Sequence, residues 1–147
     1  MAEIHHQITI DAPPAKVYDA LATAEGISRW WSRQTAVQTD SGTVLEHNPG
    51  PEHGVVRMRV AQLVPDKRVE WECISSHPST SPASAWTGTR FIFEMAESNP
   101  AAGSGPATTL DFYHTGYDEL SEYYDFNVGA WAHVLRDLKR LVESQRT

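Results

Sequence analysis

The feature that most constrains the fold is a long amphipathic segment near the C-terminus, residues 119–143. At helical spacing its apolar residues fall in one stripe, and its charged residues lie on the opposite side. The stripe consists of Leu120, Tyr124, Val128, Trp131, Leu135, Leu138 and Val142, widened by Val134 and Leu141. Such a helix needs a broad apolar surface to bury its stripe, which short helices do not offer. We therefore expect a sheet to pack against it, with Gly129 and Ala130 allowing a close approach.

Alternation of apolar and polar residues predicts this sheet. The predicted strands are residues 3–10, 34–38, 43–47, 55–64, 69–73, 89–95 and 107–115. Two short helices are expected after the first strand, one over residues 15–23 and one from residue 24 to the adjacent Trp30 and Trp31. Because neighbouring side chains of a helix point in different directions, we expect one tryptophan in the core. The other is expected at the rim or lining an opening.

The resulting fold prediction is α+β, with a curved antiparallel sheet wrapped around the C-terminal helix in one domain spanning residues 1–147. Two segments rich in Ser, Pro or Gly, residues 77–85 and 97–106, fall inside the hairpin pattern. We interpret them as loops rather than as domain linkers. Phe126 falls nearly opposite the apolar stripe, so it is expected to be exposed, covered by a loop, or part of a subunit contact.

Composition argues against several classes of function. The net charge is −7 and no long basic cluster is present, which disfavours nucleic-acid binding. No stretch approaches the about 20 apolar residues that span a membrane, and the N-terminus lacks the pattern of a signal peptide. The single cysteine, Cys73, allows no intramolecular disulfide. We therefore expect a cytoplasmic protein with no nucleic-acid or membrane partner.

A family resemblance is carried by four segments: ITIDAPPAKVYDALATAEGISRWW, WTGTRFIFEM, TTLDFYHTGY and GAWAHVLRDLKRLVE. In this order they resemble the bacterial single-domain members of the family similar to the activator of Hsp90 ATPase, within the START-like (SRPBCC, Bet v 1-like) superfamily. The resemblance implies a helix-grip fold, in which a curved sheet grips the C-terminal helix and leaves a cavity between them. It implies less about function, because the superfamily includes carriers, polyketide aromatase/cyclases and cochaperone domains.

Aromatic side chains are frequent on the faces of the strands and the helix that we expect to point inward. The candidate ligand-cavity residues are Trp31, Met58, Trp71, Cys73, Phe91, Phe93, Phe112, His114 and Trp131. Pockets for small molecules are largely apolar with few polar groups, and the same description fits a core. Both interpretations stay open at this point.

His114 is the main polar candidate, because it shares a strand face with apolar residues. An imidazole there suits three roles: binding a polar ligand atom, acid/base chemistry, or a core histidine satisfied by a backbone carbonyl or a water. Cys73 is interpreted as a buried structural thiol. Glu70 and Glu72 point outward and are interpreted as a solvated strand face. The seven histidines show no metal-ligand spacing, so no metal site is predicted. No cofactor and no catalytic residue are predicted either.

Three functions fit these features. The leading hypothesis is a non-enzymatic binder of a small apolar or amphipathic ligand. The second is a protein-interaction module related to the cochaperones, with a chaperone as its partner. The third is an enzyme of the aromatase/cyclase type that uses His114, which requires two or three polar groups converging on the substrate. A homodimer is compatible with Phe126 and with the family.

Overall fold

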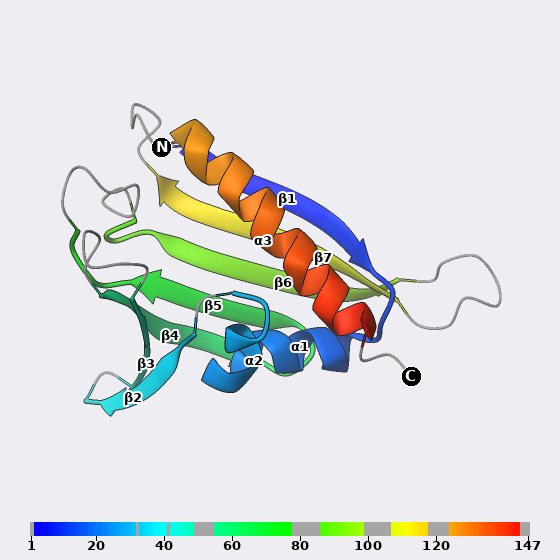
Figure 1. Ribbon diagram of the computed structural model, residues 1–147, viewed down its shortest axis with the longest axis horizontal. Coiled ribbons are helices and arrows are strands. Elements are labelled where there is room, and N and C mark those ends of the chain that lie inside the picture. Colours follow the sequence, from blue (N-terminus) through cyan, green and yellow to red (C-terminus); the bar gives the residue numbers. More distant parts are fainter. Residues whose placement is uncertain are drawn as a thin grey trace.

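The computed structural model describes residues 2–31, 33–40, 42–48, 55–77, 86–98, 107–117 and 124–144. Over these ranges the chain forms a seven-stranded antiparallel sheet with helices packed on it (Figure 1). In chain order the elements are β1 (Ala2–Ile10), α1 (Pro14–Ala22), α2 (Ala24–Ser28), β2 (Thr35–Thr39), β3 (Gly42–His47), β4 (Val56–Val64), β5 (Arg68–Cys73), β6 (Arg90–Ser98), β7 (Ala107–Tyr117) and α3 (Tyr124–Ser144). The predicted α+β architecture is confirmed.

The order of the strands in the sheet is β1-β7-β6-β5-β4-β3-β2. Strands β2 to β7 form a meander of consecutive neighbours, and β1 adds to its end by pairing with β7. Figure 1 shows α3 running across β1, β7 and β6, with α1 near its C-terminal end. Helix α1 contacts α3 as well as β5, β6 and β7, so these two helices share one face of the sheet.

The apolar stripe of α3 is buried as its periodicity predicts. Trp131, Leu135, Leu138 and Val142 are at most 2% exposed, and the flanking members of the stripe are partly buried. Leu120 and the Tyr124 and Phe126 side chains lie outside the part of the chain that is described, so the prediction for Phe126 stays a prediction. None of the described helices is long and apolar enough to cross a membrane.

Most element boundaries fall within a few residues of those predicted, with two corrections. Strand β6 continues through Glu97 and Ser98, which pair with β7, so these two residues belong to a strand rather than to a loop. Helix α2 ends at Ser28, and a turn takes the chain through Trp30 and Trp31. Residues 78–85, 99–106 and 118–123 lie outside the described ranges, as do the loop and helix-start predictions made for them.

The two adjacent tryptophans occupy different environments, as their spacing predicts. Trp30 is 5% exposed and donates its indole N–H to the Ala20 carbonyl of α1 at 2.8 Å. Trp31 is only partly buried and packs against the edge of the core. Trp30 therefore joins α1 to the turn after α2, and Trp31 lies at the rim.

Glycine has a packing role at Gly26, where α2 approaches α1. A Cβ atom added there would lie 2.2 Å from the Asp19 carbonyl oxygen and 3.0 Å from the Ala20 Cα. Both neighbours are backbone atoms, which cannot move without shifting α1. At Gly129 in α3 an added Cβ meets nothing within 4 Å. The prediction that Gly129 allows a close helix–sheet approach is therefore wrong, because this residue is on the exposed side of the helix.

These two glycines provide a matched test of the packing. Gly26→Ala should lower the free energy of unfolding by about 2–4 kcal/mol, because the methyl group forces α1 and α2 apart. Gly129→Ala should raise it by about 0.5–1 kcal/mol, because alanine favours an exposed helix interior. Urea denaturation followed by circular dichroism measures both. A Gly26→Ala chain as stable as the unchanged one would contradict the described α1–α2 contact.

Candidate functional site

A cluster of aromatic rings centred on Trp131 lies between α3 and the sheet. Among the described residues, five rings have centroids 4.4–6.2 Å from that of Trp131: Phe112, Trp31, Phe91, Trp86 and His114. Trp71 and Phe93 extend the group, with their centroids 4.9 Å apart. Tilted and offset rings at these separations attract one another in addition to burying area. We call these residues, together with Trp131, the aromatic cluster.

The structure brings the predicted site residues together in one region. All but Trp31 are at most 2% exposed: Met58, Trp71, Cys73, Phe91, Phe93, Phe112, His114 and Trp131. Met58 and Cys73 are cross-strand partners in β4 and β5, beside the aromatic cluster in the same core. The inward orientation assigned from the alternation of the strands is therefore observed. That these residues line a ligand cavity remains a prediction.

Trp31 connects the inside of the aromatic cluster with its rim. Its ring lies 5.2 Å from Trp131 and 6.3 Å from Trp71, to which it is nearly parallel at 12°. It also lies 6.2 Å from Trp86 and 4.8 Å from His47. Because Trp31 is only partly buried, it is one of the places where solvent and the aromatic interior meet.

Trp86 is a member of the aromatic cluster that the sequence analysis missed. Its indole N–H donates to Asn127 Oδ1 of α3 at 3.1 Å, and its ring lies 5.2 Å from Phe91. It begins the turn into β6, where the Thr89 N–H donates to the Trp86 carbonyl at 2.8 Å. The one sequence signal was an aromatic residue at the end of a Ser- and Pro-rich stretch. Hydrophobic periodicity does not extend into such a turn.

His114 is fully buried, and its hydrogen bonding assigns its tautomer. The Thr89 hydroxyl donates to the Trp86 carbonyl at 2.5 Å, so its proton is not available to His114. His114 Nε2, 2.7 Å from Thr89 Oγ1, must therefore be the donor in that pair. Burial lowers the pKa of His114 from 6.5 to about 3. At neutral pH the imidazole is thus uncharged and a weak base, which suits hydrogen bonding better than general-base chemistry.

A second buried histidine lies at the Trp31 side of the aromatic cluster. His47 Nδ1 is 3.2 Å from Gln34 Oε1, and both side chains are buried. Burial, and to a lesser degree repulsion from His77, lowers the pKa of His47 to about 4. This pair was also missed, because Gln34 directly precedes β2, His47 ends β3, and the two residues form no motif in the sequence.

Cys73 behaves as the predicted structural thiol. Burial raises its pKa, and its Sγ donates a weak hydrogen bond to the Ser75 carbonyl at 3.8 Å. Ser75 Oγ lies 2.8 Å from His77 Nε2 and also accepts the Arg57 N–H at 3.0 Å. Because this hydroxyl joins β4 to the segment after β5, we interpret it as structural. Among the described residues, no group of three or more His, Cys, Asp or Glu side chains is placed to hold a metal ion.

The outer face of the sheet corrects the interpretation of Glu70 and Glu72. Both point away from the core as predicted, but they are ion-paired rather than simply solvated. Glu70 pairs with Arg68 at 2.8 Å and with Arg90, and Glu72 pairs with Arg59 at 2.9 Å. Burial raises the pKa of Glu70, but hydrogen bonds from the two arginines outweigh it and hold the pKa below its usual value.

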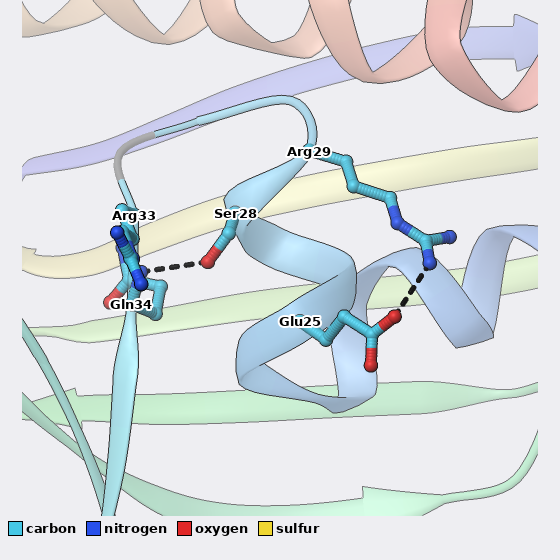
Figure 2. A pocket seen from close by; sticks show the side chains of 5 residues that line it. All are labelled: Glu25, Ser28, Arg29, Arg33 and Gln34. Atoms are coloured by element: carbon cyan, nitrogen blue, oxygen red, sulfur yellow. Dashed lines mark hydrogen bonds and ion pairs between the residues drawn. The ribbon is translucent and has the colours of Figure 1, made fainter.

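Surface hollows occur away from the aromatic cluster. Figure 2 shows one of about 530 Å³ lined by Glu25, Ser28, Arg29, Arg33 and Gln34. In it Ser28 Oγ accepts the Gln34 N–H at 2.8 Å, and Arg29 pairs with Glu25 at 2.8 Å. Polar and charged residues line this hollow, and none of the rings described above does. The aromatic cluster is therefore the stronger candidate for binding an apolar molecule.

Comparison with known proteins assigns the chain to a family. The profile of the family described as "Polyketide cyclase / dehydrase and lipid transport" matches residues 1–96. Among solved structures, the chain is similar to the Aha1 dimer from Colwellia psychrerythraea, with a TM-score of 0.77, 26% identity and 97% of each chain covered. No protein of curated function matches the sequence.

Two more distant structures show the same fold. Protein MLL2253 from Mesorhizobium loti has a TM-score of 0.76 at 17% identity, covering 97% of this chain and 98% of the other. CalU16 from Micromonospora echinospora has a TM-score of 0.70 at 13% identity, covering 97% of this chain and 77% of the other.

The two buried histidines predict a loss of stability in mild acid. Between about pH 7 and pH 5, unfolded histidines with a pKa of about 6.5 bind protons that His47 and His114 exclude when folded. The unfolded state then binds more protons, so stability falls as the pH falls, by about 2 kcal/mol for each histidine. His114→Gln should remove about half of this loss, as measured by urea denaturation at several pH values.

The control variant is His133→Gln, which changes an exposed histidine of α3 and should keep the full pH dependence. If His114→Gln does not fold, His47→Gln is expected to give the same reduction. Equal losses between pH 7 and pH 5 in the His47 variant and the unchanged chain would show that burial does not keep that histidine neutral.

Proposed function

Because the chain belongs to the polyketide cyclase / dehydrase and lipid transport family, we propose that it binds a small hydrophobic or amphipathic molecule between its sheet and α3. The observation that carries this proposal is the aromatic cluster. It combines a buried apolar interior with two partly exposed tryptophans, Trp31 and Trp86, at its rim. Sites for small molecules have this composition, largely apolar with a few fixed polar groups.

The proposed binding residues are those predicted from the sequence, with one addition. They are Trp31, Met58, Trp71, Cys73, Phe91, Phe93, Phe112, His114 and Trp131, together with Trp86. The aromatic rings supply contact area, and neutral His114 places a polar group among them. A molecule that enters beside Trp31 and Trp86 contacts rings from α3 and from the sheet together.

The chemistry of His114 supports binding rather than catalysis. A general base works best when its pKa lies near the operating pH, and a pKa of about 3 is far below neutrality. The Nε2 proton is also directed at Thr89, which holds the ring in one orientation. His114 therefore suits a positioning contact with a ligand better than proton abstraction.

The likeness to the Aha1 dimer supports a second proposal, that two copies of this chain associate. The similarity covers nearly the whole of both chains, which supports a subunit of the same fold as the one that forms that dimer. The chaperone-interaction alternative rests on the same relative. It predicts binding that depends on surface charges and is independent of the aromatic cluster.

Native mass spectrometry followed by organic extraction tests both proposals. Purified from its own host, the protein should carry a small hydrophobic molecule at near-stoichiometric amount, and the spectrum should show a dimer. The binding proposal would be contradicted if no molecule co-purifies and no lipid or aromatic compound raises the melting temperature in a thermal-shift screen. A monomer at micromolar concentration would contradict the dimer proposal.

A variant pair then locates the site. Phe93→Trp enlarges a ring of the aromatic cluster and should weaken binding of the extracted molecule by about tenfold or more, because the larger ring takes volume that the ligand needs. Tyr113→Trp enlarges an aromatic side chain on the outer face, where Tyr113 stacks on His5 at 4.5 Å, and should leave the affinity unchanged. Isothermal titration calorimetry measures both, and thermal melts confirm folding. Equal affinity of the two variants would place the ligand elsewhere.

A further inference from the structure

Two indole N–H groups inside the aromatic cluster have no hydrogen-bond acceptor among the described residues. They belong to Trp71 of β5 and Trp131 of α3, whose side chains are 0% and 2% exposed. An indole nitrogen can only donate, so neither group can be satisfied by a donor nearby. A buried donor without an acceptor destabilises the fold, and folded proteins rarely keep one without a reason.

Two other tryptophans, the buried Trp30 and the partly buried Trp86, do have acceptors for their indole N–H groups. Trp30 donates to the Ala20 carbonyl at 2.8 Å, where α1 meets the turn after α2. Trp86 donates to Asn127 Oδ1 at 3.1 Å, at the rim of the aromatic cluster. The fold thus provides acceptors where indoles join its elements. The part of the chain that is described offers none to the indoles of Trp71 and Trp131.

Both unpaired donors belong to rings with the same neighbours. The Trp71 and Trp131 ring centroids lie 6.3 and 5.2 Å from that of Trp31, and 6.2 and 5.4 Å from that of Phe91. Trp31 is partly exposed and its ring neighbours both indoles, so we expect a molecule to approach them from its side. Trp31 and Trp71 are also nearly parallel, at 12°, a geometry that favours flat ring systems next to them.

We propose that the ligand is a flat aromatic molecule with a neutral carbonyl-type oxygen, and that the indole N–H groups of Trp71 and Trp131 donate to this oxygen. This inference rests on the proposed binding function and adds which chemical feature of the ligand is recognised. A neutral oxygen suits the site better than a carboxylate. All members of the aromatic cluster are uncharged, and burying a carboxylate among uncharged groups is costly.

A matched pair of probes tests the inference: 1-indanone and indane share one bicyclic skeleton and differ by a carbonyl group. Each is titrated into the full chain labelled with ¹⁵N, and the indole N–H signals are followed by NMR. Hydrogen bonding should move the Trp71 and Trp131 signals downfield with 1-indanone and not with indane. The Trp30 signal, whose donor is already paired, should stay in place. We expect 1-indanone to bind about tenfold more tightly than indane.

Variants test the two donors separately. Trp71→Phe and Trp131→Phe keep an aromatic ring and remove the N–H, so each should lower the preference for 1-indanone over indane at least threefold. Trp30→Phe is the control and should keep the preference. Binding of indane by the same variant shows that its site is folded, because a ratio within one protein cancels any general loss. If Trp71→Phe does not fold, Trp131→Phe and the signals of the unchanged chain decide.

The outcomes separate this inference from the function on which it rests. Equal affinities for the two probes, or indole signals that do not respond to 1-indanone, overturn the acceptor inference and leave apolar binding standing. A preference that survives in both Phe variants assigns recognition to another group and also overturns it. If neither probe binds while the extracted host molecule does and lacks an acceptor, the acceptor inference again fails alone. If no ligand of any kind binds, both fail.

Discussion

Burial of the apolar stripe of α3 against the sheet is the interaction on which the rest of the structure depends. The stripe is too long to be covered by α1, so it requires neighbouring strands that present apolar side chains to one side of a sheet. Trp131 lies at the centre of this contact, with rings from β6 and β7 within 6.2 Å. Pairing of β1 with β7 extends the surface under the helix, and α1 covers the part that α3 leaves.

Polar groups are divided between the two faces of the sheet, and this division limits the available chemistry. Arginine and glutamate side chains pair across strands on the outer face, where Glu70 contacts two arginines. On the helix side two histidines, His47 and His114, lie near the rings, and burial keeps both neutral. An interior of this kind suits ring contacts and single hydrogen bonds rather than interactions with charged groups.

Periodicity was sufficient to predict the fold, since a period of two or 3.6 residues reports which side chains share a buried face. Alternation along β5, β6 and β7 correctly predicts that Trp71, Phe91 and His114 point inward. It could not find Trp86, whose position depends on a turn and on Asn127, 41 residues away. Nor could it find the ion pairs of Glu70, because these depend on the register between neighbouring strands. Alternation shows that a residue faces outward but not what it meets there.

The sequence is compatible with an aromatic cluster that is only a core and with one that binds a ligand. The hydrogen bonding of the tryptophans helps to distinguish these two interpretations. A cluster that served only as a core would gain stability from an acceptor for each indole, or from phenylalanine in place of tryptophan. Trp30 shows that this chain can supply such an acceptor through a backbone carbonyl. The unpaired donors of Trp71 and Trp131 instead lower stability at the centre of the molecule. Buried donors that lack an acceptor in the fold are expected where the residue type is selected for ligand binding rather than for stability.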